Sequence, residues 1–205
     1  MNDPRAYQTD RIDRRIHLIF NTIAPVYGKF HNYLMKEYRV SAGILDEKIH
    51  LTGKKVLDMG TGTGAWAASF LPYRPAGITG VDMSAKMIRE AGKRHPGINF
   101  IQGNIEHLTH IPDHSFDIVT ASFVVHGVKQ DKRKRILDEM FRISKRYVVI
   151  QDFAGNTPFV IRVLEWLERS DYKHFKHHIV EELNNYTPHI SVIPIRLGAG
   201  LYIAE

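Results

Sequence analysis

Cysteine is absent from the 205 residues of this sequence. Its absence excludes disulfide bonds, cysteine-ligated zinc, iron–sulfur clusters and a thiol nucleophile. Internal repeats and low-complexity tracts are absent as well, so neither a repeat architecture nor a disordered chain is expected. Hydrophobic residues make up 43% of the sequence. This content is sufficient for one globular domain with, at most, a small appended element.

Long apolar runs are also missing. No segment approaches the roughly 20 apolar residues that a helix needs to cross a bilayer. The first fifteen residues are charged and polar, and they lack the apolar stretch of a secretory signal. We therefore expect a cytoplasmic protein without a membrane span.

Basic residues outnumber acidic ones, 28 to 22, which gives a formal net charge of +6. Many of them lie within residues 129–146. Apolar residues recur at helical spacing through the same segment, which indicates one helix with a buried face. We interpret the basic side chains as its solvated face, and we do not expect nucleic acid as a partner. The basic residues concerned include Lys132, Arg133, Lys134 and Arg135.

Residues 1–50 have the pattern of helices. An amphipathic stripe runs from Ile12 to Ile23 and stops at Pro25, and two further stripes follow, over residues 30–38 and 44–49. After Gly53 the pattern changes. The sequence therefore predicts two parts, a helical segment over residues 1–50 and a domain over residues 51–205.

The second part alternates between short apolar runs and amphipathic stretches. Such alternation predicts an α/β fold of the Rossmann-like, doubly wound kind, with a mostly parallel, seven-stranded sheet and a C-terminal antiparallel hairpin. Ligands of such sheets bind at the carboxyl ends of the strands. The predicted strands are 56–59, 77–81, 98–102, 116–122, 147–152, 190–197 and 201–204. The predicted helices are 65–71, the one that Ser84 caps and that runs through Arg94, 131–143, 158–169 and 175–185.

A glycine-rich turn follows the first strand, with glycine at positions 60, 62 and 64. Missing side chains let a flat ligand approach the backbone, and the next helix offers free N–H groups to it. Because Ala65 comes next, the turn also satisfies the dinucleotide fingerprint G-x-G-x-x-G/A. The turn alone therefore leaves the cofactor open.

Two carboxylates flank this turn. Asp58 lies two positions before Gly60, where its charge would repel a pyrophosphate and attract a ligand with ammonium and sulfonium groups. Asp82 ends the second predicted strand, where its two oxygens can accept both hydroxyls of a ribose. Asp82 suits nicotinamide adenine dinucleotide equally well, whereas Asp58 favours the cationic ligand.

Four segments of the chain together resemble the motifs of class I S-adenosylmethionine-dependent methyltransferases. They are residues 56–64 (VLDMGTGTG), 80–87 (GVDMSAKM), 100–106 (FIQGNIE) and 115–126 (SFDIVTASFVVH). The resemblance covers nearly all of the chain and implies S-adenosylmethionine as cofactor, with S-adenosylhomocysteine as product. In the third motif the family commonly has Asp where this chain has Asn104, whose carbonyl oxygen can still accept a hydrogen bond from the adenine amino group. The cofactor-binding residues that the resemblance implies are Asp58, Gly60, Thr61, Gly62, Gly64, Asp82, Met83, Asn104, Ile105 and Ser122.

Residues 20–27 (FNTIAPVY) are similar to the N-terminal segment of the branch that methylates carbon in ubiquinone and menaquinone biosynthesis. The resemblance implies a helical lid with Tyr27 near the substrate. Two features depart from this branch. Residues 143–146 (ISKR) stand in place of its Leu-Lys-Pro-Gly-Gly turn, and the chain is shorter than is usual there.

His126 follows the fourth predicted strand, on the edge where ligands are expected. It is the candidate base or substrate contact, and a purely structural histidine is the alternative. Asp152 ends the fifth strand and is a weaker candidate. For His31, in the lid, we favour packing over chemistry. The sequence therefore assigns His126 and Tyr27 to catalysis.

A second group of histidines comprises His174, His177 and His178. His174 and His178 have the i, i+4 spacing of two metal ligands on a helix. No third ligand forms a motif with them, so we interpret them as a solvated helix face and expect no metal.

Absent motifs narrow the acceptor. The Asn/Asp-Pro-Pro-Tyr/Phe motif typical of methylation of exocyclic base amines is missing after the fourth strand, and no cysteine is available for pyrimidine C5 or arsenic methylation. A small, partly apolar organic acceptor is therefore expected, with a monomeric or homodimeric enzyme. Two alternatives remain. One is an oxidoreductase that uses nicotinamide adenine dinucleotide, and the other is a non-catalytic module that binds the cofactor or RNA.

Overall fold

The computed structural model describes residues 35–155 and 171–205, which belong to one compact unit that begins at Met35. The predicted helices over residues 12–23 and 158–169 lie outside the described residues, as do Tyr27 and His31. The boundary predicted at residue 50 remains a prediction.

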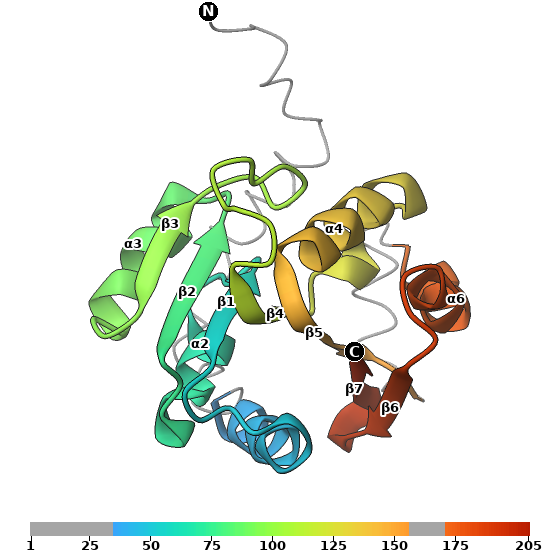
Figure 1. Cartoon of the computed structure of the whole chain (residues 1–205), viewed down its shortest axis with the longest axis horizontal. Coiled ribbons are helices and arrows are strands. Elements are labelled where there is room, and N and C mark those ends of the chain that lie inside the picture. Colours follow the sequence, from blue (N-terminus) through green and yellow to red (C-terminus); the bar gives the residue numbers. More distant parts are fainter. Residues whose placement is uncertain (1–34, 156–170) are drawn as a thin grey trace, which may run out of the picture. The chain divides into compact units, whose positions relative to one another are not determined.

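Seven strands form one sheet in the order β3-β2-β1-β4-β5-β7-β6 (Figure 1). The first five strands in sequence are mutually parallel, whereas β7 is antiparallel to both β5 and β6. The predicted fold class, including the C-terminal hairpin, is therefore confirmed. The strands are β1 (Lys55–Met59), β2 (Gly77–Asp82), β3 (Asn99–Gln102), β4 (Phe116–Ser122), β5 (Ser144–Phe153), β6 (Ile190–Pro194) and β7 (Ala199–Ala204).

The helices connect these strands. A helix covers residues 35–49, followed by α2 (Ala65–Ser69), α3 (Ala85–Arg94), α4 (Gln130–Ile143) and α6 (Tyr172–Asn184). Three short 3-10 helices are η2 (Leu71–Tyr73), η3 (Val125–Gly127) and η4 (Arg196–Gly198). The helix predicted over 65–71 is shorter than expected, because Phe70 ends α2 and Pro72 belongs to η2. The strand predicted over 190–197 ends at Pro194 for a similar reason, since η4 takes up the residues that follow.

Alternate residues of a strand point to opposite faces of the sheet. Their contacts therefore show which helix covers which face. On one face, Val119 and Ile150 pack in a single buried cluster with Met140 of α4 and Phe175 of α6. On the other face, the indole Nε1 of Trp66 in α2 donates to Thr120 Oγ1 at 3.0 Å.

The helix over residues 35–49 lies on the same face as α2. The ring of Tyr38 packs 5.3 Å from that of Trp66. Farther along this helix, Ser41 Oγ accepts a hydrogen bond from Gln151 Nε2 at 3.2 Å. The helix thus packs against the sheet near the carboxyl ends of β4 and β5. Within the described part of the chain, no helix combines the length and the apolar character needed to cross a membrane.

The surface of α4 departs from the prediction at one position. Lys134 and Arg135 are exposed and pair with Asp138 and Glu106, as a solvated face requires. Arg133, however, is completely buried. The interpretation of Arg133 as part of the solvated face is therefore wrong, because its guanidinium points toward α6 and the turn before α4.

The neighbouring strands β1 and β4 mark the point where the chain changes direction through the sheet. From β1 the chain continues to β2 and β3 on one side, and from β4 it continues to β5 on the other. The loops after β1 and β4 follow these two strands, at the carboxyl edge where ligands bind to such sheets.

Candidate functional site

The loop after β1 is held in place by hydrogen bonds from Gly60 N and Thr61 N to Val81 O, at 2.8 and 2.9 Å. Gly60, Gly62 and Gly64 all have positive φ, at 78°, 54° and 80°. A side chain on Gly60 would lie 2.6 Å from Val124 Cγ2, and one on Gly64 would lie 2.7 Å from the ring of Phe100. At Gly62 a side chain would meet nothing within 4 Å.

Close packing inside the protein therefore requires glycine at positions 60 and 64. The sequence argument, in which all three glycines clear an edge for a ligand, fits Gly62 alone. At Gly62 the backbone borders open space, so a ligand can approach it there.

Asp58 is the buried carboxylate of this loop, with 1% of its surface exposed. The hydroxyl of Thr61 donates to its Oδ2 at 2.6 Å, whereas Oδ1 is buried without a hydrogen-bond partner. Burial raises the pKa of Asp58 to about 7, and the negative charge of Asp82 adds to this effect. An unpartnered, desolvated carboxylate of this kind favours a cationic hydrogen-bond donor as its ligand.

Asp82 ties the end of β2 to the glycine loop. Its Oδ2 accepts a hydrogen bond from Gly62 N at 2.8 Å, and its Oδ1 accepts one from Ser84 N at 2.8 Å. A carboxylate oxygen can accept more than one hydrogen bond, so these two contacts are compatible with the predicted role of Asp82 in binding ribose hydroxyls. Ser84 itself caps α3 as predicted, since its hydroxyl accepts a hydrogen bond from Met87 N at 3.3 Å.

The remaining predicted cofactor residues follow β2, β3 and β4. Met83 is 44% exposed and offers an apolar surface at the end of β2. Asn104 Oδ1 accepts a hydrogen bond from Glu106 N at 3.0 Å, so part of its acceptor capacity stabilises the turn. Ile105 packs against the core, and Ser122 Oγ donates to Tyr38 Oη at 3.2 Å.

The fold thus brings the predicted cofactor residues to one edge of the sheet. Their chemistry fits S-adenosylmethionine, because Asp58 Oδ1 needs a donor that the cofactor's ammonium group can supply. Gly62 leaves room for that group to approach, and Asp82 suits its ribose. Direct contact with the cofactor remains a prediction for each residue.

The loop after β4 turns sharply at Phe123. This residue has a φ of 52°, which is rare for a bulky side chain and costs about 1–2 kcal/mol. A hydrogen bond from Phe123 N to Gln151 O, 2.8 Å long, holds the turn, and its ring packs 5.2 Å from that of Phe153. The turn leads the chain into η3, which carries His126.

His126 and Asp152 are the pair that the fold creates at this edge. His126 Nδ1 lies 2.7 Å from Asp152 Oδ1, and Asp152 is completely buried. The backbone N–H of His126 also donates to Asp152 Oδ2, at 3.3 Å. A carboxylate at Nδ1 keeps the proton of a neutral imidazole on that nitrogen, so that the lone pair of the ring is on Nε2.

Aromatic rings surround this pair. The ring of Phe153 lies 4.8 Å from that of His126, and the ring of Phe175 lies 6.4 Å from it, both edge to face. Tyr172 packs at 5.0 Å from Phe153. The histidine is therefore mostly desolvated, with 8% of its surface exposed. The site combines one polar pair with an apolar wall.

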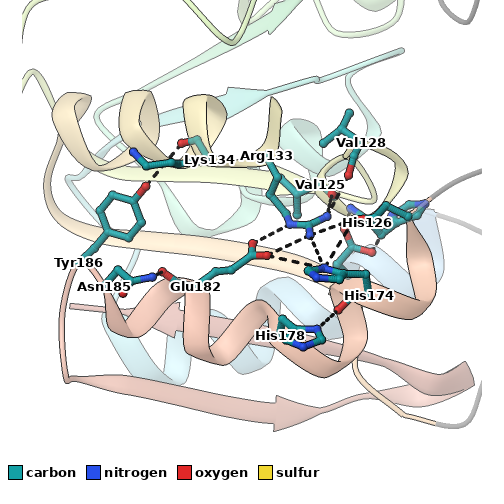
Figure 2. A network of polar contacts seen from close by, with 12 residues as sticks. Val125, His126, Val128, Arg133, Lys134, His174, His178, Glu182, Asn185 and Tyr186 are labelled. Carbon is teal, nitrogen blue, oxygen red and sulfur yellow. Dashed lines mark hydrogen bonds and ion pairs between the residues drawn. The ribbon is translucent and has the colours of Figure 1, made fainter. Parts of the chain in front are cut away.

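Arg133, which sequence reasoning assigned to the surface, lies beside this site and contacts His174 of α6 (Figure 2). His174 Nδ1 is 3.2 Å from Arg133 Nη2, and the His174 ring stacks on that of His178. The side chain of His174 is still 35% exposed, so the interpretation as part of a solvated face holds in part, and its ring also borders the Arg133 network. Among residues 35–155 and 171–205, no three histidine or carboxylate side chains are placed to hold a metal ion.

Known proteins match this chain in both sequence and fold. A family profile described as "Methyltransferase domain" matches residues 56–146. A demethylmenaquinone methyltransferase from Renibacterium salmoninarum is 31% identical over 169 residues, which cover 78% of this chain and 69% of the relative. One from Chlorobaculum tepidum is 37% identical, over 55% of this chain and 48% of the relative. The chain therefore spans about half the length of some of the curated relatives that it matches.

Two solved structures show the same fold. Magnesium protoporphyrin IX methyltransferase from Synechocystis, solved with bound S-adenosylhomocysteine, has a TM-score of 0.64 at 17% identity, over 83% of each chain. An S-adenosylmethionine-dependent methyltransferase from Aquifex aeolicus has a TM-score of 0.60 at 17% identity, over 78% of this chain and 87% of that chain.

Proposed function

Because this chain belongs to the class I S-adenosylmethionine-dependent methyltransferases, near their quinone-biosynthesis branch, we propose that it methylates a small, partly apolar hydroxyaromatic acceptor. The observation that carries the acceptor proposal is the desolvated His126–Asp152 pair at the cofactor edge of the sheet. S-adenosylmethionine supplies an electrophilic methyl group on a good leaving group, so the protein needs mainly to position the acceptor and exclude water.

His126 serves as the base in this proposal. Displacement at the methyl group requires an electron-rich acceptor, and a neutral hydroxyl becomes one when it loses its proton. His126 Nε2 takes that proton while Asp152 stabilises the imidazolium that forms. The acceptor then donates an electron pair to the methyl carbon as the methyl–sulfur bond breaks. For transfer to carbon, the ring afterwards loses the proton of the methylated carbon and regains aromaticity.

The names of the relatives support an aromatic acceptor of the quinone type. A quinone ring is electron-poor and cannot attack the methyl group, whereas its reduced dihydroxy form can. The phenyl rings of Phe123, Phe153 and Phe175 around His126 suit such a flat, partly apolar molecule. We propose that the reduced form is the reacting species. We also propose that residues 1–50, with Tyr27, act as the lid over the acceptor.

Neither alternative from the sequence is favoured. A dinucleotide would bring a pyrophosphate to the loop beside the buried Asp58 carboxylate, and the relatives are methyltransferases. An RNA-binding module would rest on the basic residues of α4. Those residues pair with carboxylates instead, Lys134 with Asp138 and Arg135 with Glu106.

The test is methyl transfer by the purified chain to a probe, 2-prenyl-1,4-naphthoquinone reduced with borohydride, with S-adenosylhomocysteine measured as product. His126→Ala and the larger His126→Gln should lower turnover about 10²- to 10⁴-fold and leave the affinity for S-adenosylhomocysteine unchanged. His177→Ala, at an exposed histidine of α6, is the matched control.

Three results would count against parts of this function. Unchanged turnover in both His126 variants would remove the base role. Transfer to an amine probe but to no reduced hydroxyaromatic probe would overturn the acceptor class. Calorimetric binding of nicotinamide adenine dinucleotide in place of S-adenosylhomocysteine would overturn the cofactor assignment.

A further inference from the structure

Arg133 is the largest completely buried side chain of the described residues, and it is charged. It projects from the first turn of α4 into the space between that helix, η3 and α6 (Figure 2). A buried guanidinium is stable only when nearly all of its N–H groups have partners. The partners of Arg133 therefore show what the residue holds together.

One end of the guanidinium binds the turn that carries His126. Arg133 Nη1 donates to Val128 O at 2.9 Å and to Val125 O at 3.3 Å. These two carbonyls bracket His126 and Gly127 in the chain. Since Nη1 has two N–H groups, both are engaged in holding the two ends of η3.

The other end binds α6. Glu182 receives two hydrogen bonds, from Arg133 Nε at 2.7 Å and from Nη2 at 3.0 Å. Nη2 also lies 3.2 Å from Asp171 Oδ2, at the start of the same helix. Hydrogen bonds to Glu182 and Asp171 raise the pKa of Arg133 above its usual value, although burial alone would lower it. The residue thus stays charged and links both ends of α6 to η3.

A 3-10 turn such as η3 has few hydrogen bonds of its own, so external bonds decide where its side chains point. Asp152 fixes the imidazole of His126 from β5, but it does so only if the turn stays in place. Arg133 fixes the backbone on both sides of His126. An arginine is suited to this because its rigid fork reaches two carbonyls and a carboxylate at once, which the single ammonium of a lysine cannot do.

We propose that Arg133 is the positioning residue for His126 and holds η3 so that the imidazole meets Asp152. This inference deepens the proposed function and rests on it, because positioning affects turnover only if His126 is the base. In the competing explanation Arg133 only fastens α6 to α4, and His126 is placed by packing against Phe153 and Phe175.

The two explanations differ in the state of the His126 ring, which is measurable without any acceptor. Nitrogen-15 NMR of the full chain, labelled at histidine, reports which ring nitrogen carries the proton. The spectrum of His126→Gln identifies the His126 signals among the twelve histidines. Above the pKa of the imidazole, the wild-type ring should carry its proton on Nδ1.

Arg133→Lys should lose this preference for Nδ1 and lower kcat about 100-fold, with the KM for S-adenosylmethionine unchanged. Arg135→Lys is the matched control, because Arg135 lies on the exposed side of the same helix and pairs with Glu106. Glu182→Gln keeps Arg133 and its bonds to the two carbonyls, and it should keep the Nδ1 proton.

The proposal is overturned if Arg133→Lys, folded and binding S-adenosylhomocysteine, retains the Nδ1 proton. It is equally overturned if Glu182→Gln loses that proton as fully as Arg133→Lys does, since α6 would then place the ring. Should Arg133→Lys fail to fold, the double variant Arg133→Gln/Glu182→Gln replaces the ion pair by neutral amides. The same loss is expected of it, and retention of the Nδ1 proton there also overturns the proposal. If the wild type has the Nδ1 proton but transfers no methyl group, only the proposed function is refuted.

Discussion

His126 Nδ1 and Asp152 Oδ1 lie 2.7 Å apart, although the two residues are separated by 26 positions in the chain. The fold brings them together from η3 and from the end of β5. Asp152 reaches the ring from the strand end, and its two oxygens also receive the backbone N–H groups of His126 and Phe153. These two N–H groups hold the carboxylate beside the imidazole. Such an arrangement sets the tautomer of the histidine rather than the place of the acceptor.

Asp152→Asn tests this role of the carboxylate. The amide can donate to Nδ1, which would move the ring proton to Nε2 and remove the lone pair that acts as base. We expect kcat to fall about 10²- to 10⁴-fold, with the affinity for S-adenosylhomocysteine unchanged. Steady-state kinetics and calorimetry measure the two quantities. Asp138→Asn, at an exposed carboxylate paired with Lys134, is the control, and turnover equal to that control would contradict the prediction.

Asp58 predicts how binding depends on pH. Its pKa is raised from 3.8 to about 7, mainly by burial. Cofactor with an ammonium group binds the charged carboxylate, so the affinity for S-adenosylhomocysteine should rise as the pH increases through about 7. Below that pH, binding should release a proton, which calorimetry in buffers of different ionisation enthalpy detects. Asp58→Asn should bind more weakly and lose the pH dependence, and a retained dependence would assign it to another group.

The raised pKa of Asp58 also predicts how the stability of the ligand-free protein depends on pH. Ligand affinity should rise with pH, whereas this stability should fall. Because the fold favours the protonated form of Asp58, the stability that this residue contributes is fully present below the unfolded pKa near 4. It is lost as the pH rises through about 7. Ligand-free protein should therefore unfold more easily at pH 8 than at pH 5 by the amount due to Asp58. Urea titrations of the wild type and of Asp58→Asn, compared at both pH values, measure that amount.

The sequence predicted those elements whose signals are local. β4 begins and ends where its apolar run does, at Phe116 and Ser122. Ser84 caps α3 because a serine before an amphipathic stretch satisfies a free N–H group. The parallel direction of the first five strands followed from the alternation of strands and helices. Periodicity and capping depend on neighbours in the chain, which a sequence displays directly.

Arg133 shows what the sequence could not reveal. It stands among Lys132, Lys134 and Arg135, and its residue type does not distinguish it from them. Its partners Asp171 and Glu182 are 38 and 49 residues away in the chain. Whether a basic residue on α4 meets solvent or carboxylates depends on where α6 packs, and tertiary contacts alone determine that.

The glycine loop offers a matched pair of variants. Both Gly60 and Gly62 have positive φ, so alanine costs about 1–2 kcal/mol at either position. At Gly60 the new methyl group would also lie 2.6 Å from Val124 Cγ2, which adds about 1–3 kcal/mol of overpacking. Gly60→Ala should therefore lower the free energy of unfolding more than Gly62→Ala. Val124→Ala should partly rescue Gly60→Ala and not Gly62→Ala, and additive effects in both pairs would refute the steric argument.

The buried hydrogen bond between Trp66 and Thr120 links α2 to β4. β4 is the strand that precedes the loop to η3 and His126. Thr120→Val keeps the shape but leaves the indole N–H of Trp66 buried without a partner, at a cost of about 1–3 kcal/mol. Thr120→Ser keeps the hydroxyl and loses one methyl group, so a cost of only about 1 kcal/mol is expected. In the double variant Trp66→Phe/Thr120→Val neither partner remains, and the total loss should be smaller than the sum of the single losses. Urea unfolding followed by circular dichroism gives the free energies of the wild type, of these variants and of Trp66→Phe alone, and strict additivity would show that the hydrogen bond contributes nothing to holding α2 on the sheet.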